Sequence, residues 1–351
     1  MTSETWWEKI SKSSTQLPTR VPIPREHVDV GEKLGTIKPN EHYFQVLINE
    51  IYLANYREWF STYDPMLFIV SEFNYGQKKE TVPYIVGPSM IESMIEKYGQ
   101  KAPPGMIFSD TRVTGLHPYR GDGLTLSLIL FQIKRDAYPR KFMQIFENAA
   151  KVLDFTTMLS TYVKVAGIVL DGVESMLNKT DVQPLIGLRK EFPSDVFESQ
   201  YFALVNMPES KFNPNELWVR NGQLVHGDNL PDAKPYRDSD YVLFSINRTS
   251  ERDDVETLPF YPLWNRVVEE ARVAKEDNWE SAKTAMSNLY LAMRLSPDIT
   301  ESHAEALADD YITKMQAIQT TACKIAKLGD VKTKPSELDG IRAKSLSILK
   351  M

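Results

Sequence analysis

A short segment near residue 220 constrains the fold more than any other part of the sequence. Residues 216–226 read Glu-Leu-Trp-Val-Arg-Asn-Gly-Gln-Leu-Val-His, so two runs of strand-forming residues flank Asn221-Gly222. Asn and Gly accept the positive φ angles of a type I′ turn, which is a common connection in two-residue β-hairpins. The pattern predicts antiparallel β-structure in the second half of the chain and excludes an all-helical fold.

Strand-rich and helix-rich stretches alternate twice along the chain. The first β-rich stretch covers about 43–133, and within it residues 124–128 alternate Leu with Thr and Ser, as on a strand with one apolar face. Apolar residues then follow helical spacing over 139–178. A second β-rich stretch, about 182–248, precedes a helical stretch at 256–329. This segregation favours an α+β fold over a doubly wound parallel sheet.

We therefore expect an antiparallel β-sandwich-like body with inserted helices and a C-terminal helical bundle. The expected parts are an extended, proline-interrupted N-terminal arm (1–40), a mixed sandwich-like domain (41–255) with inserted helices (139–178), a C-terminal helical bundle (256–329) and a polar tail (330–351).

Composition supports a packed protein of a reducing compartment. Apolar residues make up 42% of the chain and aromatic residues 11%, which is enough to bury a core. The single cysteine, Cys323, cannot form an internal disulfide. The N-terminus shows no signal-peptide pattern, because no basic region precedes an apolar run. A cytoplasmic location is expected.

Charge is concentrated in one region. The whole chain carries −6, whereas residues 253–310 contain 13 acidic and 5 basic residues, a net charge of −8. An acidic surface repels phosphate backbones, so nucleic-acid binding through this region is disfavoured. The region is interpreted either as a solvated helical face or as a docking surface for a basic partner.

The last helical stretch has a continuous seam. Small and apolar residues recur at heptad a/d positions over three heptads, at Ala304, Ala308, Tyr311, Met315, Ile318, Ala322 and Ile325. Asp298 and Glu301 are placed as a capping box at its start. The seam predicts coiled-coil-like packing, with Tyr311, Met315 and Ile318 as candidates for binding another protein or a second copy. An internal core is the alternative.

The strongest polar cluster surrounds the hairpin. His226, Asp228, Asp238 and Asp240 lie within fifteen residues. An imidazole with carboxylates could hold a divalent metal that activates water. The same residue types also form turns, which is the simpler interpretation.

His117 is the second candidate for chemistry. It lies in a loop with Arg120 and Asp122, a combination that could serve acid–base catalysis, although a plain loop is the simpler interpretation. The sequence has no phosphate-binding glycine loop, nucleophile elbow or paired C-x-x-C motif.

Residues 156–177 are apolar around most of a helical circumference. Their length matches a bilayer core, but Lys164 and Asp171 near the middle make a membrane span costly. A helix buried between a sheet and other helices explains the pattern equally well.

These observations favour a cytosolic, non-enzymatic protein-interaction or regulatory module that needs no cofactor. Its partner would be another protein or a second copy, bound through the C-terminal helices; membrane binding is not expected in the resting state. One alternative is a metal-dependent hydrolase with its site near the 216–240 hairpin, where His117, His226 and Asp228 are the catalytic candidates. The other is an autoinhibited effector that releases the 156–177 helix toward membranes.

Overall fold

The computed structural model describes residues 19–29, 34–54, 57–58, 61–76, 78–87, 106–134, 182–273 and 279–330. The chain divides into two compact units, residues 1–254 and 255–351. The first is called the β-body and the second the helical unit.

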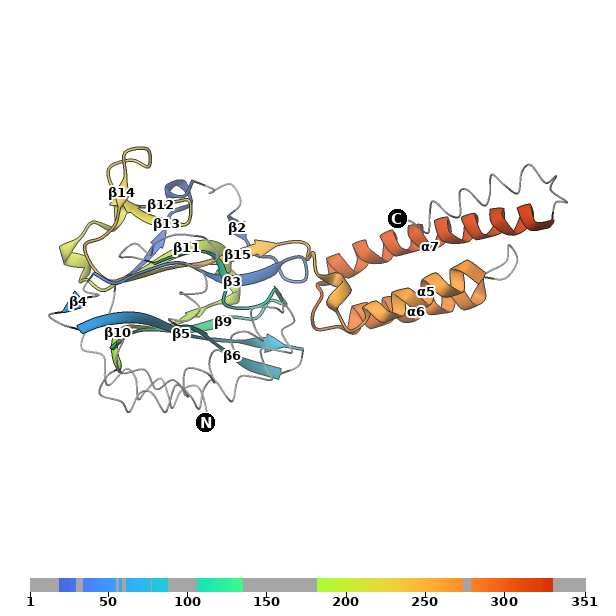
Figure 1. The fold of residues 1–351 in the computed structure, drawn as a ribbon, viewed down its shortest axis with the longest axis horizontal. Coiled ribbons are helices and arrows are strands. Elements are labelled where there is room, and N and C mark those ends of the chain that lie inside the picture. Colours follow the sequence, from blue (N-terminus) through green and yellow to red (C-terminus); the bar gives the residue numbers. More distant parts are fainter. Residues whose placement is uncertain are drawn as a thin grey trace. The chain divides into compact units, whose positions relative to one another are not determined.

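The described strands of the β-body form two large antiparallel sheets and one small sheet (Figure 1). The first large sheet has the order β1-β11-β15-β3-β7, with β2 paired to β11 and β8 paired to β3. Its strands are β1 (Thr19–Ile23), β2 (Gly35–Thr36), β3 (Tyr43–Tyr52), β7 (Met106–Arg112), β8 (His117–Pro118), β11 (Glu198–Val205) and β15 (Tyr241–Thr249).

The second large sheet has the order β10-β9-β5-β4, with β6 also paired to β5. Its strands are β4 (Arg57–Glu58), β5 (Ser61–Tyr75), β6 (Lys78–Val86), β9 (Leu124–Lys134) and β10 (Val182–Phe192). The small sheet consists of β12 (Leu217–Arg220), β13 (Gln223–His226) and β14 (Lys234–Pro235). Short 3₁₀ turns occur at Arg25–His27, Ser194–Val196, Glu209–Lys211, Pro214–Glu216 and Val255–Thr257.

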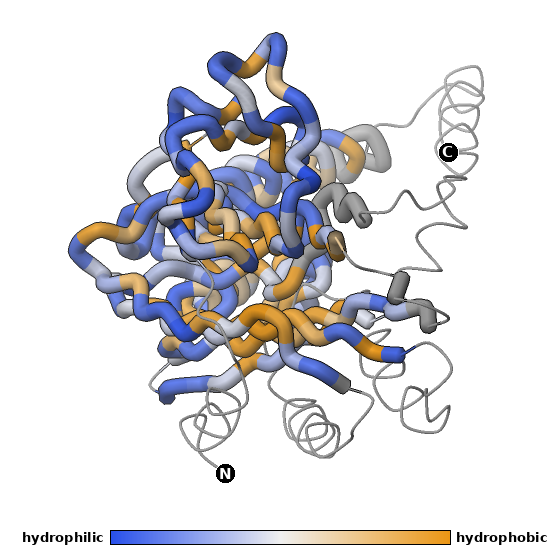
Figure 2. The backbone as a smooth tube through the Cα atoms, turned by 90° about the vertical axis from the view of Figure 1, so that its left-hand side faces the viewer, coloured by the Kyte–Doolittle hydropathy of each residue, from blue (hydrophilic) through white to orange (hydrophobic). Residues whose placement is uncertain are grey.

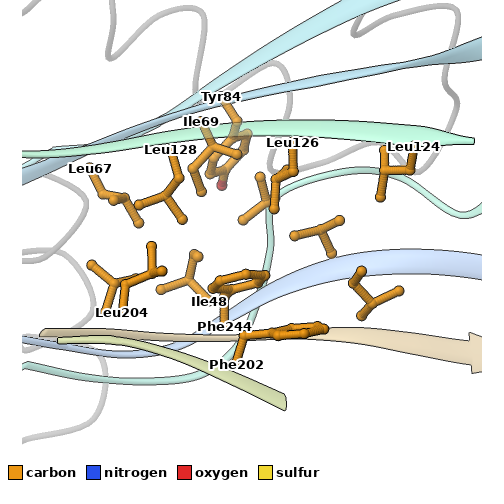
Figure 3. Close-up of a cluster of buried hydrophobic side chains, with 14 of the residues drawn as sticks. Ile48, Leu67, Ile69, Tyr84, Leu124, Leu126, Leu128, Phe202, Leu204 and Phe244 are labelled. Atoms are coloured by element: carbon orange, nitrogen blue, oxygen red, sulfur yellow. The ribbon is translucent and has the colours of Figure 1, made fainter. Parts of the chain in front are cut away.

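The two large sheets share one hydrophobic core. Figure 3 shows side chains from both sheets pointing toward each other, among them Leu126 and Leu128 of β9 and Phe244 of β15. Along the tube of Figure 2, hydrophobic residues concentrate on the strands and hydrophilic residues on the outer turns. Leu124, Leu126 and Leu128 all face this core, as their alternation predicts. The predicted α+β fold with antiparallel sheets is confirmed.

Both β-rich stretches of the sequence contribute to both large sheets. β15 pairs with β3 from Tyr241↔Tyr52 to Thr249↔Tyr43, and β10 pairs with β9. Each sheet therefore combines strands from the two halves of the β-body and depends on contacts between distant parts of the sequence.

The predicted hairpin is confirmed. Arg220 of β12 pairs with Gln223 of β13, and Asn221 and Gly222 between them have φ angles of 52° and 71°. This small sheet shares a second hydrophobic core with the first large sheet, in which Leu217, Val219 and Leu224 pack with Tyr241 and Leu243.

Part of the expected N-terminal arm belongs to the first large sheet. Residues 19–23 form β1, which pairs antiparallel with β11. Pro22 is compatible with this position because β1 is at the end of the strand order, where a missing backbone donor is tolerated. Val21 and Ile23 are buried in the second core. The alternation of apolar residues therefore indicates the structure of this segment better than its proline content does.

The described part of the helical unit contains α5 (Tyr261–Val273), α6 (Glu280–Leu295) and α7 (Glu301–Asp330), which pack against one another. The start of α7 differs from the predicted capping box. The hydroxyl of Thr300 accepts the backbone N–H of His303 at 3.2 Å, while Asp298 is buried. Thr300 is one residue before the helix, the usual N-cap position, and therefore serves as the cap.

None of the described helices is both long and apolar enough to cross a membrane. The predicted inserted helices at 139–178, including 156–177, lie outside the described residues, as does the predicted tail from residue 331 onward.

Candidate functional site

The three helices pack around a seam that contains most of the predicted heptad residues. Trp264 of α5 stacks on Tyr311 of α7, with ring centroids 4.3 Å apart and planes 12° apart. Burial, followed by the negative groups nearby, raises the pKa of Tyr311 to about 12, so its hydroxyl stays neutral. Met315 is also buried, whereas Ile318 is half-buried. Tyr311 and Met315 therefore contribute to the internal packing of the helical unit.

Other apolar side chains of the same helices face solvent. Leu291 and Leu295 lie one turn apart on α6, with exposed fractions of 56% and 74%. On α7, Ile312 is 38% exposed. Helical spacing explains the contrast, because Met286, Leu289 and Met293 occupy the buried face of α6 while residues 291 and 295 occupy another.

An ion pair links the neighbouring faces of α6 and α7. Arg294 of α6 reaches Glu305 of α7, with 3.2 Å between Nη1 and Oε1. Leu291 precedes Arg294 by three residues, and Ile312 follows Glu305 by seven, so each shares a helix face with its ion-pair residue. Leu291, Leu295 and Ile312, together with the acidic residues around them, are called the α6–α7 surface.

The edge of the α6–α7 surface is acidic. Glu301 and Glu305 have side-chain exposed fractions of 46% and 63%, and both approach the same arginine, Arg294. Exposed pairs of this kind contribute little stability, about 0–1 kcal/mol each. Their carboxylates therefore remain available to interact with positive charge on another molecule.

The four proposed metal ligands near the hairpin do not form one site, because they have different contacts. Asp240 accepts the backbone N–H of Ala54 at 2.8 Å and the Asn206 amide at 3.1 Å. His226 packs edge-on to Tyr236, and Asp228 and Asp238 are exposed. Within the described ranges, which include all four predicted ligands, no group of three or more His, Cys, Asp or Glu side chains could hold a metal ion. Asp240 ties loops together instead, because its carboxylate accepts hydrogen bonds from two of them.

His117 is enclosed by aromatic rings. It is 1% exposed, and its ring lies 4.0 Å from that of Phe73 and 5.0 Å from that of Phe44. Neither ring nitrogen has a hydrogen-bond partner among the described residues. Burial, with a smaller effect of Arg252, lowers the pKa of His117 to about 3. The imidazole is therefore neutral near pH 7 and is a weak base. Arg120, expected beside it, hydrogen-bonds the Asn40 side chain at 3.1 Å.

A buried glutamate is the main polar feature that sequence reasoning missed. Glu50 of β3 is fully buried, receives the Leu224 backbone N–H at 2.8 Å and forms an ion pair with Arg237 at 3.1 Å. The available sequence signal was a single acidic residue within the apolar run Tyr43–Tyr52. A buried carboxylate needs a partner, so such a residue indicates a polar network.

Comparison with known proteins gives no relative: no family model, no curated protein and no solved structure matches this chain.

Proposed function

We propose that the chain is a non-enzymatic protein-interaction module of the cytosol and that its α6–α7 surface binds an amphipathic, basic helix of another protein. The observation that carries this proposal is the exposure of Leu291 and Leu295, one helical turn apart. Side chains one turn apart form the kind of apolar row that receives the i, i+4 and i+7 anchors of a partner helix.

Charge determines the chemistry of the proposed partner. Residues 253–310 carry a net −8, and the exposed carboxylates Glu301 and Glu305 belong to the α6–α7 surface. Basic residues beside the anchors of the partner would meet these carboxylates, which increases the association rate and excludes acidic partners. A regulatory role follows from such binding if the partner is active only in its free form.

A direct test uses two synthetic helical peptides of about 18 residues, a length at which helices form in solution. Both carry leucines at i, i+4, i+7 and i+11; one has lysines on its other face and the other has glutamates. Fluorescence anisotropy with the full-length protein should show binding of the lysine peptide alone, and this binding should weaken as salt increases.

Variants locate the contact. The double variant Leu291→Ser/Leu295→Ser should weaken binding of the lysine peptide by about tenfold or more, since central apolar anchors dominate helix-in-groove affinity. Val196→Ser is the matched control, because Val196 is 65% exposed but lies in the β-body. Equal binding of both peptides, absence of binding, or an unchanged double variant would overturn the proposal. A concentration-dependent dimer lost in the double variant would instead identify a second copy as the occupant.

A further inference from the structure

The chain itself contains a segment whose charge is opposite to that of the α6–α7 surface. Residues 331–351, called the tail, follow α7 directly and lie outside the described residues. The tail contains five basic and two acidic residues, a net charge of +3, whereas residues 253–310 carry −8. Charge complementarity of this kind favours contact between the two segments.

The tail also has the sequence pattern of an amphipathic helix. Ser336 follows Pro335 and forms a capping-box pattern with Asp339. At a helical spacing of about 100° per residue, five apolar residues share one stripe about 160° wide. They are Leu338, Ile341, Leu346, Ile348 and Leu349. Lys344 and Lys350 flank the stripe, one on each side, so the tail has the chemistry that the proposed function assigns to the partner.

A helix with the sequence of the tail needs a surface to be stable. Helices of about 15 residues are marginal in water, and the glycine inside this one, Gly340, costs about 1 kcal/mol relative to alanine. Packing of the apolar stripe against another apolar row would supply the missing stability, because most helices in proteins are stabilised by tertiary packing.

The tail is long enough to reach the α6–α7 surface. An extended run over 331–336 spans up to about 20 Å, and a helix over 337–351 adds about 22 Å. Since α7 rises about 1.5 Å per residue, Ile312 lies about 27 Å and Glu305 about 37 Å from the end of α7 at Asp330. A tail that turns back along α7 can therefore cover both residues.

The α6–α7 surface offers an apolar row and available carboxylates to such a helix. Leu291 and Leu295 are 56% and 74% exposed. Glu301 is held loosely, with 3.8 Å between its Oε1 and Nη2 of Arg294. An exposed pair at this distance contributes little, so a lysine can approach the carboxylate at small cost.

We propose that the tail folds back as a helix onto the α6–α7 surface and competes there with the basic helix of the partner. This inference rests on the proposed function, because it uses the same surface and the same ligand chemistry. The apolar stripe of the tail packs on Leu291 and Leu295, and its flanking lysines meet Glu301 and Glu305. The partner has to displace the tail, which lowers its apparent affinity.

Hydrogen exchange of the full-length protein, measured without any peptide, tests the tail contact itself. In Ile341→Ser/Ile348→Ser, amides of α6 and of the first half of α7 should exchange about threefold faster or more than in the wild type, because helices that lose a bound segment open more often. Ala343→Ser/Met351→Ser is the matched control, since both residues fall on the opposite face of the tail helix, and its exchange should equal that of the wild type. Unchanged exchange in Ile341→Ser/Ile348→Ser would overturn the proposal.

Binding of the lysine peptide separates this inference from the proposed function. Ile341→Ser/Ile348→Ser should bind the peptide about fivefold more tightly or more, because it lacks the internal competitor, and the control variant should bind as the wild type does. Equal binding by all three proteins would overturn the competition by the tail and leave the proposed function standing. If none of them binds the peptide while α6 exchange still rises in Ile341→Ser/Ile348→Ser, the proposed function fails and the tail contact stands.

Discussion

Glu50 shows how one residue fixes the contact between two sheets of the β-body. The pairing of β3 with β15 shifts register between Leu243 and Phe244, which marks a β-bulge. Before the bulge, Ile48 faces the core between the large sheets; after it, Ile51 faces that core and Glu50 points to the small sheet. There Glu50 binds Arg237 and the Leu224 backbone, and so attaches the hairpin sheet to β3.

Removing the Glu50 carboxylate should destabilise the β-body. Glu50→Ala leaves the Leu224 N–H buried without its acceptor and leaves Arg237, 30% exposed, without its counter-charge. Breaking a buried pair in this way costs about 3 kcal/mol. Urea unfolding should report this loss, whereas Glu198→Ala, an exposed carboxylate of β11, should change the free energy of unfolding by less than about 0.5 kcal/mol. Equal effects of the two substitutions would contradict the role of Glu50.

The same carboxylate predicts a pH dependence. Burial raises the pKa of Glu50 above its ordinary value of 4.5, although the Leu224 N–H, Tyr241 and Arg237 oppose this shift. Between the unfolded and folded pKa values the folded protein binds the extra proton, so its stability falls as pH rises above about 4.5. Glu50→Gln cannot ionise, so the wild type should lose stability relative to this variant across that window. The free energies of unfolding of the two proteins are compared across this pH range. A difference that stays constant, or that shifts in favour of the wild type as pH rises, would contradict the predicted direction.

At the scale of elements, the hairpin is held by local backbone chemistry. Gly222 has a φ of 71°, and a Cβ at this position would meet nothing within 4 Å. Gly222→Ala should therefore cost about 1–2 kcal/mol through the left-handed backbone alone. Asn221→Gly, which also accepts positive φ, should be nearly neutral. Denaturant unfolding of both variants measures the difference between their free energies of unfolding. Equal values would show that the turn can change type to accommodate alanine.

The α5–α7 seam depends on packing rather than on local backbone. Met315 is 6% exposed and belongs to the same seam as the Trp264–Tyr311 stack. Met315→Asp would bury an unpaired charge and should unfold the helical unit, which circular dichroism would record as lost helix. Ile318→Asp is the matched variant, and its half-buried position should make the loss much smaller. If the Met315→Asp variant stays folded but no longer binds a partner, the seam is the docking site and not an internal core.

At the scale of the whole molecule, local patterns predicted elements better than they predicted assembly. The alternation of Leu124–Leu128 and the Asn221-Gly222 turn predicted strands, because period-two burial and positive φ are local properties. β6 lies within the predicted β-rich stretch 43–133 but was not singled out as a strand, because its start, Lys78-Lys79-Glu80, is charged; Val82–Val86 is buried by pairing with β5. Pairing between distant strands has no comparable local signal.

The candidate sites were also hard to predict, because they depend on contacts between segments that are distant in the sequence. Exposure of Leu291 and Leu295 was not evident, since apolar residues on the buried and exposed faces of α6 look alike in sequence. A pocket of the β-body lined by Gln45 and by residues 247–249 and 251–253 was missed, because Gln45 and these residues become neighbours only when β3 pairs with β15. The metal cluster was predicted from closeness in sequence, but Asp240 is occupied by Ala54 and Asn206, which are distant from it in the chain.

Hydrogen exchange of the full-length protein, measured with and without the lysine peptide, tests the central claim most directly. If the α6–α7 surface is the docking element, peptide binding should slow amide exchange in α6 and in the first half of α7 and leave β3, β11 and β15 unchanged, because bound helices open less often. Slower exchange confined to the β-body, or no change at saturating peptide, would contradict the account.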